Sequence, residues 1–187
     1  MTTPTVPAAQ SGVAHYDRAS ITFHWLTAVL VVGLFALAEI WSFLPRGTPT
    51  RRLLQSLHIS FGLALAAIFV LRVIWRACAG RRLPPASTGL LRVASTGVHG
   101  LLYLLLATQI VLGFLFRWAQ AEPFAFFGLF DVPTLIQIDH EQRRFIGGLH
   151  DTVAWIIIVL AAVHALAALF HHYFLRDGVL RRMLRSR

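Results

Sequence analysis

The sequence has no lysine and only one cysteine, and Asp and Glu together supply 8 of its 187 residues. A single thiol, Cys78, excludes a disulfide within the chain and a cluster of thiolate ligands. Charged residues make up 13% of the chain and hydrophobic residues 57%, a balance typical of a polytopic membrane protein. The net charge of +9 comes from arginines that lie in the gaps between apolar runs, where membrane topology places them. We therefore expect a lipid bilayer as the surroundings and no nucleic acid as a partner.

Four apolar runs are long enough to cross a bilayer, which takes about 20 residues. They cover residues 20–43, 54–78, 94–116 and 147–174. The sequence predicts an all-α membrane protein, a bundle of four transmembrane helices. No charged segment precedes the first run and no small-residue cleavage site follows it, so we expect this run to be a retained helix.

Arginine is distributed unevenly among the connections between these runs. Around the second connection there are four arginines and no acid, and after the fourth run there are five against one Asp. These are Arg76, Arg81, Arg82 and Arg92, and then Arg176, Arg181, Arg182, Arg185 and Arg187. The positive-inside rule places these segments and both termini in the cytoplasm. The first connection, with Arg46, Arg51 and Arg52, argues mildly against this orientation. The larger number of arginines in the second connection and the tail outweighs it.

The third connection, residues 117–145, is long and rich in phenylalanine and acids. Long loops in compact domains are often functional. This connection could contain a short helix that lies on the outer surface.

Histidines lie inside the apolar runs at two depths. His150 and His164 are fourteen residues apart, so both leave one face of the fourth run about 21 Å apart along its axis. With the topology above, His58 shares the outer level with His150, and His24 shares the inner level with His164. An ionisable group inside a membrane is costly and marks a functional site by default.

Two histidines at each depth match the ligand needs of haem better than those of zinc. Haem iron takes axial ligands on opposite sides of a flat ring, hence from different helices, whereas zinc takes four ligands at one point. The sequence therefore predicts two stacked bis-histidine haems in the bundle. Gly62, Gly147 and Gly148 would leave room for a flat macrocycle, although small residues also serve close helix packing in membranes.

Other readings of these polar residues stay open. His99, near the inner start of the third run, could replace His24 as a ligand, although its position favours contact with a propionate or a lipid head group. Arg72 lies at the inner level, where it could pair with a haem propionate or extend to the interface. A lone membrane histidine could also join helices or relay protons.

Several segments resemble the bacterial cytochrome b561 family, and the resemblance runs from Tyr16 to the arginine-rich tail. The segments are YDRASITFHW, LHISFG, the Arg72–Arg76 spacing, HGLLYLLLATQIVLGF, GLHDTVAW and VHALAALFHHYFLRD. The resemblance implies a four-helix inner-membrane cytochrome with two haems b (iron), ligated by His24 with His164 and by His58 with His150. The implied organisation is a flexible tail at 1–15, a di-haem transmembrane domain at 16–176 and a basic cytoplasmic tail at 177–187.

The same resemblance implies an oxidoreductase that takes electrons from superoxide on the periplasmic side and reduces ubiquinone. It makes His171 a candidate for quinone contact, although a histidine at the interface can simply meet head groups. Arg46, Arg51 and Arg52 are candidates for steering the superoxide anion. No catalytic residue is predicted.

Two other functions remain from the sequence. One is a cytochrome b anchor subunit that relays electrons between quinone and a soluble dehydrogenase or hydrogenase partner. The other is a transporter or cation channel in which the membrane histidines form a proton path.

Overall fold

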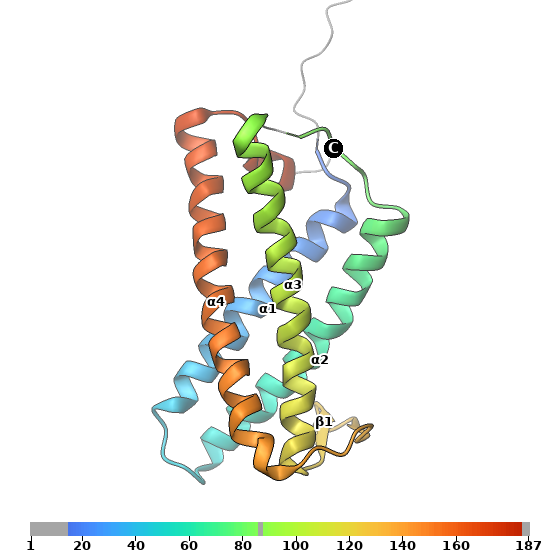
Figure 1. Cartoon of the computed structure of the whole chain (residues 1–187), viewed down its shortest axis with the longest axis vertical. Helices are drawn as coiled ribbons and strands as arrows, with labels where there is room; N and C mark the ends of the chain where they lie inside the picture. Colours follow the sequence, from blue (N-terminus) through green and yellow to red (C-terminus); the bar gives the residue numbers. More distant parts are fainter. Residues whose placement is uncertain (1–14, 86–87, 185–187) are drawn as a thin grey trace, which may run out of the picture.

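Four long helices account for most of the protein in this computed structural model, which describes residues 15–85 and 88–184 (Figure 1). They are α1 (Arg18–Ser42), α2 (Pro49–Cys78), α3 (Gly89–Gln120) and α4 (Arg143–Phe170). All four are long and apolar enough to cross a membrane, which confirms the predicted four-helix bundle. Residues 1–14 of the predicted N-terminal tail, with Arg185 and Arg187 of the C-terminal tail, lie outside the described residues.

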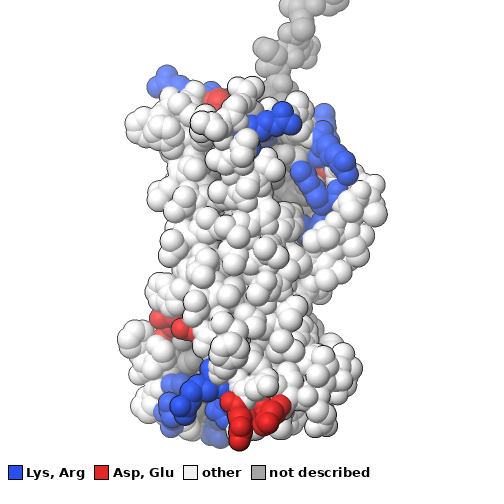
Figure 2. All heavy atoms as spheres, in the orientation of Figure 1, with Lys and Arg blue, Asp and Glu red and all other residues white. Residues whose placement is uncertain are grey.

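The surface of the bundle is divided by charge. On the face that Figure 2 shows, arginine, aspartate and glutamate gather towards the two ends, and the band between them is almost uncharged. One end carries the start of α1, the end of α4 and the connection from α2 to α3, and we call it the terminal end. The other carries the connections from α1 to α2 and from α3 to α4, and we call it the hairpin end (Figure 1).

The helices associate as two pairs. α1 packs mainly on α2 and α3 mainly on α4, while α1 touches α4, and α2 touches α3, only sparsely. Figure 1 shows the first pair crossing the second at an angle. The membrane histidines lie where the two pairs face each other, with His24 opposite His164 and His58 opposite His150.

Side-chain caps set where the first two helices begin. The Asp17 carboxylate accepts hydrogen bonds from the Ser20 backbone N–H at 2.9 Å and the Ser20 hydroxyl at 2.7 Å, so α1 begins at Arg18. Thr48 caps α2 in the same way, and Pro49 occupies the first helical position, which needs no N–H donor.

Asp17 also joins three segments at the terminal end. Its carboxylate accepts a hydrogen bond from Trp75 Nε1 of α2 at 2.9 Å and from the Arg81 backbone N–H at 3.0 Å. Burial raises the pKa of Asp17, but these bonds and those from Ser20 outweigh it, so the pKa lies well below its usual value.

The C-terminal segment packs against the same end. The short 3-10 helix η3 (Leu180–Met183) supplies backbone carbonyls from Arg182 to the Tyr16 N–H at 3.1 Å and from Met183 to Trp25 Nε1 at 2.9 Å. The two ends of the described chain are therefore bonded to each other.

The third connection contains a structure that the sequence did not suggest. Strands β1 (Phe124–Phe126) and β2 (Phe130–Val132) form a two-stranded antiparallel hairpin, and the one helical turn is the 3-10 helix η1 (His140–Gln142). Ser60 of α2, only 1% exposed, anchors the hairpin by accepting a hydrogen bond from the Phe127 N–H at 3.0 Å. The hairpin is thereby fixed to the side of α2.

Candidate cofactor sites

The histidine pair at the hairpin end consists of His58 from α2 and His150 from α4. Their ring centroids lie 6.3 Å apart, with the ring planes at 72°. His58 Nδ1–H donates to the Leu34 carbonyl at 3.0 Å, which leaves the lone pair on Nε2 available to a metal. The Gln109 amide lies 3.2 Å from His150 Nε2, in position to donate to it.

The pair at the terminal end consists of His24 from α1 and His164 from α4. Their ring centroids lie 6.4 Å apart, with the ring planes at 73°. The two pairs therefore repeat one geometry at two levels of the bundle. A third histidine, His99 of α3, has its centroid 5.1 Å from that of His164, and its Nδ1–H donates to the Ser95 carbonyl at 2.6 Å.

The spacing within each pair fits a metal between two imidazoles. With a metal–nitrogen distance of about 2 Å on each side, two ring centroids on opposite sides of one metal stand roughly 6 Å apart. Both pairs meet this spacing. The centroids of His99 and His164 are closer than it allows. Within residues 15–85 and 88–184, no three His, Cys, Asp or Glu side chains group as metal ligands, so the three or four protein ligands of zinc are not assembled.

The surroundings of the pairs fit a flat cofactor. On α3, a Cβ added at Gly113 would lie 3.5 Å from His150 Cε1. On α2, a Cβ added at Gly62 would meet no atom within 4 Å. The Phe116 ring stacks beside His150, with centroids 6.4 Å apart and planes at 28°. His150 Nδ1 is buried without a hydrogen-bond partner among the described residues. A half-buried imidazole beside small residues and between sparsely touching helix pairs suits a planar macrocycle with imidazole ligands.

Arg72 lies beside the pair at the terminal end. Its Nη2 is 3.4 Å from His24 Nδ1, and its Nε donates to the Tyr103 hydroxyl at 2.9 Å. The guanidinium also lies over the Tyr103 ring, 5.1 Å from the centroid. Arg72 is thus held inside the bundle by polar contacts and does not simply extend to the interface.

Sequence reasoning missed three side chains at these sites. Tyr103 accepts a hydrogen bond from Arg72, and Gln109 contacts His150. The Trp41 ring packs edge-on against the His58 ring, with centroids 4.9 Å apart. A signal for the first two was present, because polar side chains inside an apolar run are costly and usually have a partner.

His171 lies apart from both pairs, at the end of α4. It opens the π-helical turn η2 (His171–Leu175), and its Nδ1–H donates a hydrogen bond to the Asp177 carboxylate. Burial raises the pKa of Asp177, but the bonds from His171 and the Val179 N–H and the charges of His171 and Arg182 outweigh it. The pKa of Asp177 is therefore lowered.

The three arginines of the first connection do not form one exposed cluster. Arg51 Nη1 donates to the Trp41 carbonyl at 2.8 Å and the Leu44 carbonyl at 2.7 Å, so this guanidinium closes the connection between α1 and α2. Arg46 and Arg52 are exposed. Of the three arginines, Arg46 and Arg52 therefore face solvent, and Arg51 has a structural role.

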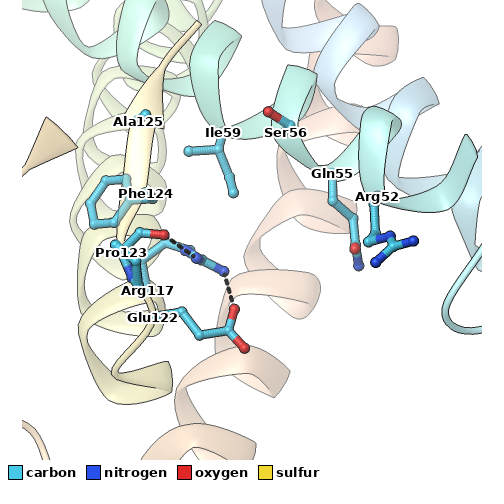
Figure 3. Close-up of a pocket in the computed structure, with 9 residues that line it drawn as sticks. All are labelled: Arg52, Gln55, Ser56, Ile59, Arg117, Glu122, Pro123, Phe124 and Ala125. Carbon is cyan, nitrogen blue, oxygen red and sulfur yellow. Dashed lines mark hydrogen bonds and ion pairs between the residues drawn. The ribbon is translucent and has the colours of Figure 1, made fainter. Parts of the chain in front are cut away.

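A pocket of about 230 Å³ lies between α2, the end of α3 and the hairpin (Figure 3). Arg52, Gln55, Ser56 and Ile59 line it from α2. Arg117 lines it from α3 and pairs with Glu122 at 3.4 Å. In Figure 3 the side chains of Arg52 and Gln55 bound one side of the opening, and the Arg117–Glu122 pair bounds the other.

Known proteins resemble this chain over nearly its whole length. Residues 15–186 match the family described as prokaryotic cytochrome b561. The chain is 36% identical over 170 residues to Cytochrome b561 homolog 2 of Escherichia coli, covering 90% of each chain. It is 29% identical over 174 residues to Cytochrome b561 homolog 1 of the same organism, covering 92% of this chain and 98% of that one. It is 28% identical over 171 residues to a protein of Yersinia pestis named Probable superoxide oxidase CybB, covering 90% and 95%.

Proposed function

Because the chain belongs to the prokaryotic cytochrome b561 family, whose members are haem b proteins that transfer electrons in bacterial membranes, we propose that it carries electrons through the bilayer between two bis-histidine haems. His58 with His150 would hold one haem, and His24 with His164 the other. The observation that supports this most directly is the repeated geometry of the two pairs, with ring centroids 6.3 Å and 6.4 Å apart. One cofactor bound twice requires such a repeat.

The position of His99 fits contact with the edge of the haem better than ligation of its iron. Its centroid lies 5.1 Å from that of His164, too close for a metal bound linearly between them, and its side chain is exposed. We assign it a contact with a propionate of the haem at the terminal end.

Arg72 has a related role in this proposal. Ligation through His24 Nε2 requires the proton to sit on Nδ1, and the contact from Arg72 Nη2 then has to be released. The freed guanidinium, still held by Tyr103, would pair with a propionate.

The protein groups around the sites orient the ligands and exclude water. The bound haem supplies an iron that gains and loses one electron, and two imidazoles leave it no open position. The Leu34 carbonyl keeps the proton of His58 on Nδ1 and fixes the ring orientation. Trp41 and Phe116 pack against His58 and His150 and shield that level from water.

The direction of transfer follows from the distribution of arginine. We place the terminal end in the cytoplasm and the hairpin end in the periplasm of the bacterial inner membrane, because the α2–α3 connection and the tail carry the larger excess of arginine. Electrons would enter at the level of His58 and His150, pass to the level of His24 and His164, and reduce ubiquinone beside His171.

Superoxide is the electron donor that we propose. The name of the relative from Yersinia pestis supports it, and so do the exposed Arg46 and Arg52 at the hairpin end, which would attract an anion. The test is the rate of superoxide-driven haem reduction against ionic strength in Arg46→Gln/Arg52→Gln, with Arg92→Gln at the terminal end as the control. The double variant should lose part of the salt dependence, and an unchanged salt slope would remove the steering role.

A second candidate function is an anchor subunit for a soluble redox partner. The hairpin end exposes apolar side chains outside the helices, including Leu129 at 77% and Phe130 at 59%. Purification in mild detergent distinguishes the two functions. A stoichiometric soluble dehydrogenase or hydrogenase subunit would favour the anchor, and a lone chain that oxidises superoxide would favour the enzyme.

The direct test of the proposed function is an optical spectrum of the purified protein with haem quantification. Two haems b per chain, low-spin in both oxidation states, are expected. One haem per chain, or a high-spin spectrum, would contradict the paired ligation.

A further inference from the structure

The end of α4 has an unusual backbone. The helix widens into the π-helical turn η2, and Arg176 then adopts the left-handed conformation with φ of 52°. π-helical turns are rare and often occur at functional sites. Here the turn and the left-handed residue reverse the chain, so Asp177 returns to the ring of His171.

The Asp177 carboxylate is held on both oxygens. One accepts from His171 Nδ1–H, and the other accepts from the Val179 N–H at 3.1 Å. The side chains of His171 and Asp177 are 20% and 26% exposed, so the pair is partly sheltered while water still reaches it. A carboxylate on Nδ1 fixes the tautomer of a neutral imidazole, leaves the lone pair on Nε2, and stabilises the imidazolium form.

A charged group on a neighbouring element, Arg182 of η3, also acts on this pair. Its charge acts on Asp177, but its Nη1 donates to the Pro84 carbonyl at 2.8 Å. Arg182 therefore braces the connection between α2 and α3 without replacing His171 as the partner of the carboxylate. His172, the next ring along the chain, has a buried Nδ1 with no partner among the described residues.

The pair lies on the same face of α4 as the histidines below it. His171 follows His164 by seven residues, which is about two turns or roughly 10 Å along the axis. A group at this position can exchange protons with water at the terminal end and with a molecule bound near the level of His24 and His164.

We propose that Asp177 is a positioning residue for His171, and that the pair delivers protons to the quinone; this rests on the proposed function. Reduction of one ubiquinone to ubiquinol takes two electrons and two protons. Two superoxide ions, each oxidised to O₂, would supply the two electrons. His171 as imidazolium gives its Nε2 proton to a quinone oxygen, becomes neutral, and takes a new proton from water at the terminal end, while Asp177 stays ionised.

The test compares Asp177→Asn with Asp177→Glu, and uses Glu141→Gln at the hairpin end as a matched control. Each protein is assayed for haem content, for haem reduction by superoxide, and for kcat and KM with a short-chain ubiquinone across the pH range. Asp177→Asn should lower kcat about tenfold or more with little change in KM. Haem content and haem reduction by superoxide should stay unchanged.

The pH profile distinguishes positioning from a structural role. Rates that need a proton from His171 fall as pH rises, and replacing Asp177 by Asn removes the negative charge that favours the protonated ring. In Asp177→Asn the fall should therefore move to lower pH, while Asp177→Glu, which keeps the charge, should return it towards the wild-type position.

Each contrary outcome has its own meaning. An Asp177→Asn protein with wild-type kcat and pH profile would overturn the inference and leave the proposed function standing. So would an Asp177→Glu protein that behaves like Asp177→Asn, or a variant that loses haem together with activity. A wild-type protein that keeps two haems but does not reduce ubiquinone would refute the proposed function itself, and the inference would fall with it.

Discussion

Replacing Asp17 by Ala should destabilise the terminal end more than any ordinary surface substitution. Its carboxylate caps α1 through Ser20 and also accepts from Trp75 Nε1 at 2.9 Å and the Arg81 N–H at 3.0 Å. One side chain thus connects the start of α1, the end of α2 and the segment that follows it. Alanine would leave all of these donors without this acceptor.

The magnitude follows from the bonds lost. Removal of an N-cap costs about 1 kcal/mol. Hydrogen bonds to a charged acceptor contribute about 1.5–3 kcal/mol each when sheltered, and less where water can replace them. Because Asp17 is only half-buried, we expect a total loss of about 3 kcal/mol. For a domain of this size, that corresponds to a fall in Tm of about 6–12 °C.

The assay is loss of the haem absorption band on heating in detergent, with all variants at one scan rate because unfolding of such proteins is often irreversible. Asp131→Ala is the control, since Asp131 is an exposed carboxylate on strand β2. A fall in Tm of less than about 2 °C for Asp17→Ala, or an equal fall in the control, would refute the reasoning.

The contribution of Asp17 should also depend on pH in a defined direction. Its pKa in the folded protein is depressed, so its stabilisation is fully present above the unfolded pKa of about 3.9. The stabilisation is lost as pH falls through the folded value. The difference in Tm between wild type and Asp17→Ala should therefore stay constant from neutral pH down to about pH 4 and shrink below it.

Two further substitutions test the packing around the pair at the hairpin end. In Gly147→Ala the new Cβ would lie 2.8 Å from Phe116 Cε2, so the ring that stacks on His150 must move. We expect a shifted haem absorption band in the optical spectrum. We also expect a loss of stability of about 1–3 kcal/mol, measured as a fall in Tm. An unaltered spectrum would show that Phe116 does not touch the cofactor. In Ser60→Ala the Phe127 N–H loses its acceptor, and limited proteolysis should cut the hairpin faster while haem content stays constant. Equal cleavage rates would contradict the anchoring role.

The sequence was sufficient to predict which histidines meet. A fixed rise per residue and the alternating direction of successive spans place His58 near His150 and His24 near His164, and the structure brings the rings of each pair together. Ligation of haem by these rings remains a prediction. His99 could not be excluded from sequence, because only the spacing of the rings distinguishes it from His24.

The hairpin could not be predicted from local signals. Its strands are three residues long, and its turn places Phe127 at φ of 48° ahead of Gly128 at 71°. An aromatic residue in the left-handed region is uncommon, and no Asn-Gly or Asp-Gly pair marks the turn. The hairpin depends instead on Ser60, which is remote in sequence.

Contacts between distant segments were also beyond the sequence. The bonds of Asp17 to Trp75 and Arg81 join residues about sixty positions apart, and nothing in the local pattern marks them as partners. The role of Arg51 was likewise hidden, because an arginine that closes a connection and one that steers an anion look the same in a sequence.

The most direct test of the paired ligation is haem content and spin state in four single variants, His24→Leu, His58→Leu, His150→Leu and His164→Leu, with His99→Leu as the comparison. Each of the four should lose one haem per chain or convert one to the high-spin form, and His99→Leu should keep two low-spin haems. Full, unaltered pigment in all four variants would contradict the account.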